Sequence, residues 1–462
     1  MRSPASAGGS ENQAKFVLDP IHQTDGIDFI LMNSTVPTPN LKTEAVAGIT
    51  TFFTMAYIVV VNPQIISAGG KTGLAFSGVL TATVLICFSM TLLMGVYAKL
   101  PFAVAPGMGI NAFFTYTIIL GKGVPWPTAL GIIFWAGVLF LMISVTRVRE
   151  SIAKAIPAEL RIAAAAGIGV FLTFIGLKNA GFIVADPVTF VKLGTLGKPA
   201  LLAIAGLVIA AFFMARKSAF AFLISIASVT LAAWALGMVT RPPQLFNLPD
   251  FRSVFFKLDI LGALKLSLAP AIIAVMFTDL FDSISTFIGV AHAGDLLDAE
   301  GHPRNLRQGL IVDSLATLGA GLAGTSSGTA YIESVAGIRM GGRTGLTSVF
   351  TALCFLPCFF IAPIAGMVPP FATAAVLILV GAAMFTSIGK IDFSKIEEGV
   401  PAFLTLILIP LTFSITQGLL WGFISHVGLY VMVGRRRDIH PVMYALALVS
   451  IGLLVLERLK FS

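Results

Sequence analysis

The sequence predicts an all-α polytopic membrane protein, and three observations carry that prediction. Of the 462 residues, 57% are hydrophobic and only 11% are charged, whereas soluble domains carry about 25% charged residues. The mean hydropathy is +0.94. Apolar stretches long enough to cross a bilayer as helices recur along almost the whole chain. This composition excludes a soluble protein and leaves no room for a soluble catalytic domain.

The chain begins with a polar segment, residues 1–40, that is rich in Ser, Asn, Pro and Gly. It lacks a basic region followed by an apolar core, the pattern that marks a cleavable signal peptide. We therefore interpret this segment as a cytoplasmic N-terminal tail.

About fourteen apolar spans follow the tail and divide into two series of seven. A further apolar piece, 441–456, is either an extra span or a helix that lies at the membrane. Because each series has an odd number of spans, the two would run in opposite directions, and inverted repeats are common in secondary transporters. The expected spans are 44–66, 74–98, 102–120, 125–146, 160–177, 199–215, 219–240, 266–290, 308–324, 326–341, 344–366, 370–388, 400–416 and 418–433.

The basic residues predict the orientation. The net charge is +8, but most Lys and Arg sit in short loops, which indicates membrane orientation and not nucleic-acid binding. A cytoplasmic N-terminus makes seven basic loops cytoplasmic. The loop 241–265 conflicts with this orientation, because it would be external and holds four basic residues. The basic residues of the seven loops are Lys99, Arg147, Arg149, Lys154, Arg161, Arg216, Lys217, Arg304, Arg307, Arg343, Lys390, Lys395, Arg435, Arg436 and Arg437.

Two of the spans, the third and the tenth, contain helix breakers. Pro106 and Gly107 interrupt the stretch 102–114, and a cluster of Gly, Ser and Thr interrupts 323–337. These spans hold corresponding positions in the two series, and paired interruptions of this kind indicate a transporter's binding site. Irregular backbone at membrane depth must face protein or a wet cavity, because lipid cannot satisfy its polar groups.

The acidic residues that fall furthest inside apolar spans are Asp279, Asp282 and Glu333. A central membrane carboxylate costs about 2.5–3.5 kcal/mol, and the two aspartates project from one helical face. Such acids are either functional or bridge neighbouring helices. As a functional cluster they would take up a proton and accept hydrogen bonds from the N–H groups of a neutral solute.

Other residues are weaker candidates. Asn111 follows the Pro-Gly break and would either contact a ligand or cap the next helix. The hydroxyls of Thr278, Ser326, Ser327 and Thr329 would bind a ligand or bond back to the helix backbone. Phe281 and Tyr331 would stack on a planar ligand or simply pack. The three cysteines show no metal-ligand spacing, so we predict no metal and no cofactor.

Four motifs resemble one known family. They are "GITTFFTMAYIVVVNPQI" (48–65), "APGMGINAFF" (105–114), "FTDLFDSISTFIGVA" (277–291) and "GTSSGTAYIESVAGI" (324–338). They occur in the same order as in the azaguanine-type adenine/guanine/hypoxanthine permeases of the nucleobase–ascorbate transporter superfamily. The resemblance covers nearly the whole chain from about residue 40.

The resemblance implies a fold of fourteen spans in two inverted seven-span repeats. Residues 41–150 and 263–367 would form a core domain, and residues 151–262 and 368–462 a gate domain with a homodimer contact. The broken spans three and ten would each contribute a short strand, with the substrate between them.

The resemblance also implies a function, the import of purine bases by proton symport across the cytoplasmic membrane, with the core moving against the gate. The proton gradient would be the driving force. Rival interpretations are an anion carrier of the related sulfate-type fold, a cation channel and a membrane enzyme. Asp279 and Glu333 would serve proton coupling, and the implied purine-binding residues are Asn111, Asp282, Glu333, Asp279, Gly109, Ile332, Phe281 and Thr278.

Overall fold

The structure, a computed structural model, describes residues 40–146, 156–297 and 303–458, apart from the side chains of 456–458. The predicted tail therefore lies outside the described residues except for Asn40. Arg147, Arg149 and Lys154, which we assigned to a cytoplasmic loop, also lie outside them.

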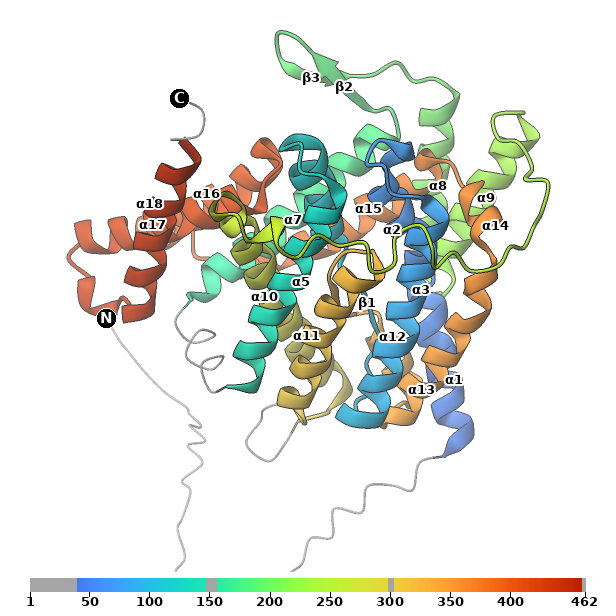
Figure 1. Cartoon of the computed structure of the whole chain (residues 1–462), viewed down its shortest axis with the longest axis horizontal. Helices are drawn as coiled ribbons and strands as arrows, with labels where there is room; N and C mark the ends of the chain where they lie inside the picture. Colours follow the sequence, from blue (N-terminus) through green and yellow to red (C-terminus); the bar gives the residue numbers. More distant parts are fainter. Residues whose placement is uncertain (1–39, 147–155, 298–302, 459–462) are drawn as a thin grey trace, which may run out of the picture. The chain divides into compact units, whose positions relative to one another are not determined.

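The described residues fold mostly into helices, accompanied by two small two-stranded sheets (Figure 1). The strands are β1 (Val104–Pro106), β2 (Ile183–Asp186), β3 (Phe190–Leu193) and β4 (Gly328–Ala330). The helices are α1 (Leu41–Met55), α2 (Ile58–Ser67), α3 (Phe76–Leu93), α4 (Met108–Ala112), α5 (Trp126–Val145), α7 (Ala158–Asn179), α8 (Lys198–Ala215), α9 (Ala221–Ala235), α10 (Ala269–Gly294), α11 (Leu306–Ala323), α12 (Ser334–Arg339), α13 (Gly345–Phe355), α14 (Ala362–Gly366), α15 (Pro370–Phe385), α16 (Ile396–Thr412), α17 (Ile415–Met432) and α18 (Pro441–Arg458).

Among the described residues, eight helical segments are long and apolar enough to cross a membrane. Four shorter apolar helices add to them, Met108–Gly121, Ala221–Ala235, Gly345–Phe360 and Pro441–Val455. The chain is therefore a multi-pass membrane protein. The number of fourteen spans and the inverted repeats stay predictions.

Local sequence signals explain where several helices begin. The side chains of Asn40, Thr344 and Ser414 accept hydrogen bonds from backbone N–H groups at the starts of α1, α13 and α17. This satisfies donors that have no partner within the helix. Proline stands in the first turn of α5, α8, α10 and α15, where its missing N–H is not needed.

The helices pack in two groups that are interleaved in the sequence. In one group, α1 packs on α12 and α13, α3 packs on α2, α11 and α13, and α5 packs on α10 and α11. In the other, α7 packs on α15 and α16, α8 packs on α9 and α15, and α17 packs on α16 and α18. Fewer contacts, such as those of α4 and α10 with α7, join the groups.

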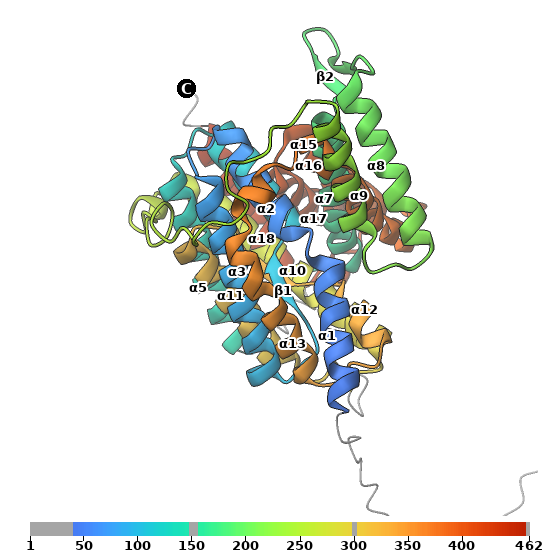
Figure 2. The ribbon, with the colours of Figure 1, turned by 90° about the vertical axis from the view of Figure 1, so that its right-hand side faces the viewer.

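The two small sheets lie in contrasting places. β1 contacts α2, α3 and α11 and lies among the helices in both views (Figures 1 and 2). The hairpin β2–β3 projects beyond the helix ends, and its Val188 and Phe190 are 83% and 84% exposed. Only the first sheet is placed to build a site at membrane depth.

Candidate functional site

The candidate site is built around the antiparallel pairing of β1 and β4. At the centre of the pair, Ala105 lies opposite Thr329. The Gly107 N–H donates to the Ser327 carbonyl at 2.8 Å and extends the ladder. Each broken span therefore finds backbone partners in the other, which is what an interrupted helix needs away from water.

Side chains of neighbouring helices form hydrogen bonds with the backbone N–H and C=O groups at the outer edges of this sheet. The Thr91 hydroxyl of α3 donates to the Val104 carbonyl at 3.0 Å and accepts from the Val104 N–H at 2.9 Å. On the other strand, the Ala330 N–H donates to the Asp313 carboxylate of α11 at 3.1 Å. The β1–β4 pair, which we call the strand crossing, is thus held both by its own backbone hydrogen bonds and by side chains of α3 and α11.

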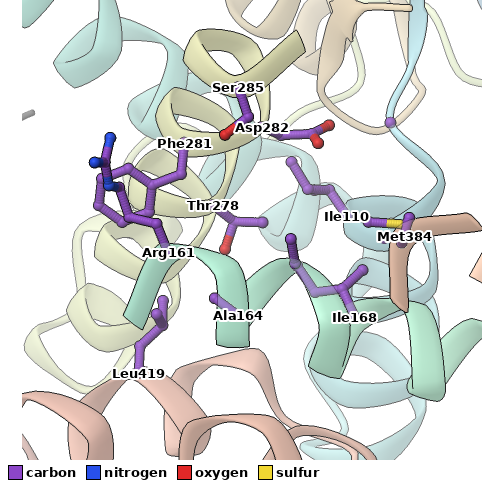
Figure 3. Close-up of a pocket in the computed structure, with 13 residues that line it drawn as sticks. Ile110, Arg161, Ala164, Ile168, Thr278, Phe281, Asp282, Ser285, Met384 and Leu419 are labelled. Atoms are coloured by element: carbon purple, nitrogen blue, oxygen red, sulfur yellow. The ribbon is translucent and has the colours of Figure 1, made fainter. Parts of the chain in front are cut away.

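Two cavities open beside the crossing. The first, which we call the α7 cavity, lies between α10 and α7 (Figure 3). The second, which we call the β4 cavity, is lined by Tyr57, Tyr331 and Glu333 among others. The two cavities share Gly107, Gly109, Asp282 and Met384, so a ligand held at Asp282 would contact both.

Two carboxylates face these cavities. Asp282 is half-buried and lines both, and Glu333 lines the β4 cavity. The Tyr57 hydroxyl donates to Glu333 Oε1 at 2.6 Å. This bond positions Glu333 without using all its accepting capacity.

Four further predicted residues also line the cavities. Thr278 and Phe281 lie on the α10 wall of the α7 cavity, where the Phe281 ring stacks on Phe277 with centroids 5.7 Å apart. Ile332 lines the β4 cavity and is 52% exposed. A Cβ on Gly109, which lines both cavities, would press into the Ile168 side chain of α7. Glycine therefore permits the close approach of α4 and α7 there.

Asn111 and Asp279 are among the lining residues of neither cavity. Asn111 is fully buried, and its amide donates to Asn62 Oδ1 at 3.0 Å. Asp279 is also fully buried and accepts from the Thr317 hydroxyl. The structure therefore brings six of the eight predicted residues to the cavities and places these two behind them.

The decisive comparison is with protein families. A family model described as the permease family matches residues 42–420. The chain belongs to this permease family, that of the nucleobase–ascorbate transporters.

Named relatives of this permease include the adenine permease AdeP of Escherichia coli strain K12, which is 42% identical over 89% of this chain and 92% of its own length. The guanine/hypoxanthine permease PbuO of Bacillus subtilis strain 168 is 37% identical over 88% of this chain and 96% of its own length. Among solved structures, the transmembrane domain of the cyanobacterial bicarbonate transporter BicA matches with a TM-score of 0.61 at 18% identity. That match covers 84% of this chain and 98% of the BicA chain, and it shows a shared fold.

Sequence reasoning missed four residues of this permease's site. Tyr57 and Met384 line cavities but look like ordinary apolar-span residues. Arg161, which we placed in a cytoplasmic loop, lies in the first turn of α7 and lines the α7 cavity. Asp313 of α11 is fully buried behind β4. An aspartate inside the apolar span 308–324 was the signal that could have revealed it.

Proposed function

We propose that this permease imports purine nucleobases across the cytoplasmic membrane by proton symport, with its N-terminus in the cytoplasm. The observation that carries the proposal is the pair of carboxylates, Asp282 and Glu333, that face adjoining cavities at the strand crossing. The names of the relatives support purines as the substrate class, since they include an adenine permease and a guanine/hypoxanthine permease.

The chemistry of the cavity walls suits a purine base. Adenine, guanine and hypoxanthine are neutral, flat and carry N–H donors, which carboxylate oxygens accept. Phe281 in the α7 cavity and Tyr331 in the β4 cavity offer aromatic faces to a planar ring. The Tyr331 hydroxyl donates to the Pro106 carbonyl at 2.5 Å, so this ring is tied to β1.

The two packing groups support a core that moves against a gate. α10 and both strands of the crossing pack with the first group, and this packing supports a core built from residues 41–150 and 263–367. α7 and α15, which supply Arg161 and Met384, belong with the second group, residues 151–262 and 368–462. Because the cavities lie between the groups, sliding one past the other would carry a bound purine across the membrane.

Proton coupling would use Asp279 together with Glu333. The Oδ1 atom of Asp279 and that of Asp313 are buried without a hydrogen-bond partner among the described residues. A buried, charged carboxylate without a neutralising partner raises the free energy of the folded protein, because it has lost its hydration. A bound proton neutralises the charge and removes this penalty. No cofactor enters this scheme.

A second candidate, an anion carrier, is favoured by Arg161, whose cationic side chain lines the α7 cavity. The two carboxylates in the adjoining cavity walls oppose it, because they would repel an anion. Uptake of labelled bicarbonate and sulfate tests this alternative directly.

Purine uptake in proteoliposomes, with and without an imposed proton gradient, tests the proposal. We expect accumulation of labelled hypoxanthine, adenine or guanine that collapses when the gradient is dissipated. Glu333→Gln keeps the size of the side chain but replaces one acceptor oxygen with a donor, so we expect it to lose purine uptake. If the wild type accumulates purine equally with and without the proton gradient, proton symport is ruled out. If Glu333→Gln takes up purine normally, Glu333 is not part of the binding site.

We further expect a homodimer with a contact on the gate helices. α8 presents exposed apolar side chains, including Leu201, Val208 and Phe212, that either a second copy or lipid would cover. The mass of the protein in a bilayer mimic distinguishes a dimer from a monomer.

A further inference from the structure

We propose that Arg161 determines specificity within the purines, by donating to O6 and N7 of a 6-oxopurine, so that guanine and hypoxanthine are transported in preference to adenine. This inference rests on the proposed purine transport and deepens it by naming the subclass of substrate.

The position of Arg161 is the first step. Its side chain rises from the first turn of α7 and lines the α7 cavity together with Thr278 and Asp282 of α10 (Figure 3). The Asp282 carboxylate points toward the Ile110 side of the cavity, away from Arg161 (Figure 3). The α7 cavity therefore has a donor at one end and an acceptor at the other.

The free hydrogen-bonding capacity at this end of the cavity is the second step. Arg161 Nε is buried and has no hydrogen-bond partner among the described residues. The Thr278 hydroxyl, in a side chain only 7% exposed, is likewise buried and without one. Much of the surrounding wall is apolar, with Ala164, Ile168 and Leu419. An unpaired donor in such surroundings is unfavourable, so an acceptor atom of the ligand is the natural partner.

The chemistry of the bases is the third step. Guanine and hypoxanthine carry an N1–H donor beside the O6 and N7 acceptors, whereas adenine carries an N1 acceptor beside an N6 amino donor. A carboxylate that accepts from N1–H and a guanidinium that donates to O6 and N7 match the pattern of guanine and hypoxanthine. Arginine binds O6 and N7 of guanine in a bidentate manner, whereas asparagine and glutamine match adenine, and such a pair discriminates by about 5- to 150-fold.

Substitution of Arg161 tests the inference. The readout is inhibition of labelled hypoxanthine uptake in proteoliposomes by unlabelled hypoxanthine, adenine and 7-deazahypoxanthine, which lacks the N7 acceptor. For the wild type we expect adenine to compete about 5- to 150-fold more weakly than hypoxanthine, and 7-deazahypoxanthine also to compete more weakly than hypoxanthine. Arg161→Gln should weaken hypoxanthine selectively, bring adenine level with it and abolish the penalty for removing N7.

Two further variants control for folding and charge. Arg161→Lys keeps the charge but not the planar fork, so its selectivity should fall between those of the wild type and Arg161→Gln. Arg216→Gln removes an exposed arginine at the end of α8 and should behave as the wild type. Adenine exchange and thermal stability at wild-type levels show that a variant is folded.

The outcomes separate this inference from the proposed function. Equal competition by adenine and hypoxanthine in the wild type overturns the role of Arg161 alone. So does an N7 penalty that persists in Arg161→Gln, or equal weakening of both purines in Arg161→Gln and Arg161→Lys. A wild-type protein that transports no purine at all overturns the proposed function, and this inference with it.

Discussion

The two aspartates of α10 lie one helical turn apart and yet belong to different regions. Asp282 is half-buried and lines both cavities. Asp279 is fully buried and is closed in by α11 and β4, where it accepts from the Thr317 hydroxyl. The difference teaches that spacing along a helix says which side chains are neighbours, but not which one faces the ligand.

The region around Asp279 is polar throughout. The Thr317 hydroxyl also lies 3.2 Å from that of Ser327 and donates to the Gly328 carbonyl at 3.1 Å. Beside it, Asp313 accepts from the Ala330 N–H, and Ala330 lines the β4 cavity. Asp313 thus contacts β4 directly and Asp279 reaches it through Thr317, which is the route that the proposed proton coupling would use.

The comparison is tested most strongly by Asp282→Asn. The amide keeps the size of the side chain but loses the negative charge and one acceptor, so a purine N–H loses a charge-assisted bond. Such bonds contribute about 1.5–3 kcal/mol, which corresponds to roughly 10- to 150-fold in affinity. We expect KM for hypoxanthine uptake to rise by that amount. An unchanged KM would place the purine elsewhere.

Asp279→Asn tests the closed side of α10. The amide oxygen can still accept from Thr317, so we expect the fold and purine exchange to persist within about threefold of the wild type. Net accumulation driven by a proton gradient should be lost, because the amide cannot take up a proton. Comparing exchange with gradient-driven uptake in the same vesicles measures this, and intact coupling in the variant would contradict a proton site at Asp279.

Tyr57→Phe should have a smaller effect. It removes the 2.6 Å hydrogen bond to Glu333 and keeps the ring, whose centroid lies 5.0 Å from that of Phe222. A hydrogen bond of this kind contributes about 0.5–1.5 kcal/mol, so we expect KM to rise roughly 2- to 10-fold. Phe222→Leu is a matched control on the same contact, and equal effects of the two variants would indicate packing alone.

The smallest effect is expected at the β2–β3 hairpin, outside the helices. Backbone N–H groups of Thr189 and Val188 and the Lys192 ammonium stabilise the Asp186 carboxylate and lower its pKa to about 2. Because the folded pKa lies below the ordinary value of 3.8, this stabilisation is complete above that value and is lost as the pH falls toward about 2. Asp186→Asn should leave the pH profile of uptake between about pH 5 and 8 unchanged. A shifted profile would show that the hairpin contributes to coupling.

The sequence determined the class of the protein and pointed to the two interrupted spans where we propose its site. The low fraction of charged residues and the recurring apolar spans demand a membrane, because only internally bonded helices satisfy the backbone there. Pro106 and Gly107 marked one interruption and the Gly-Ser-Thr cluster before Glu333 the other, since neither permits a regular helix. The acids inside spans then pointed to the cavities in which we propose that the substrate binds.

Only the tertiary structure decided which of these side chains face the cavities. The buried Asn111 amide donates a hydrogen bond to Asn62 and does not face a cavity. Tyr57 donates a hydrogen bond to Glu333, although 276 residues separate the two in the sequence. Arg161 lies in a helix and not in the expected loop, because α7 begins at Ala158. The first turn of α7 therefore places Arg161 in the wall of the α7 cavity. Such facts depend on contacts between distant segments, and neither composition nor local spacing encodes which distant segments meet.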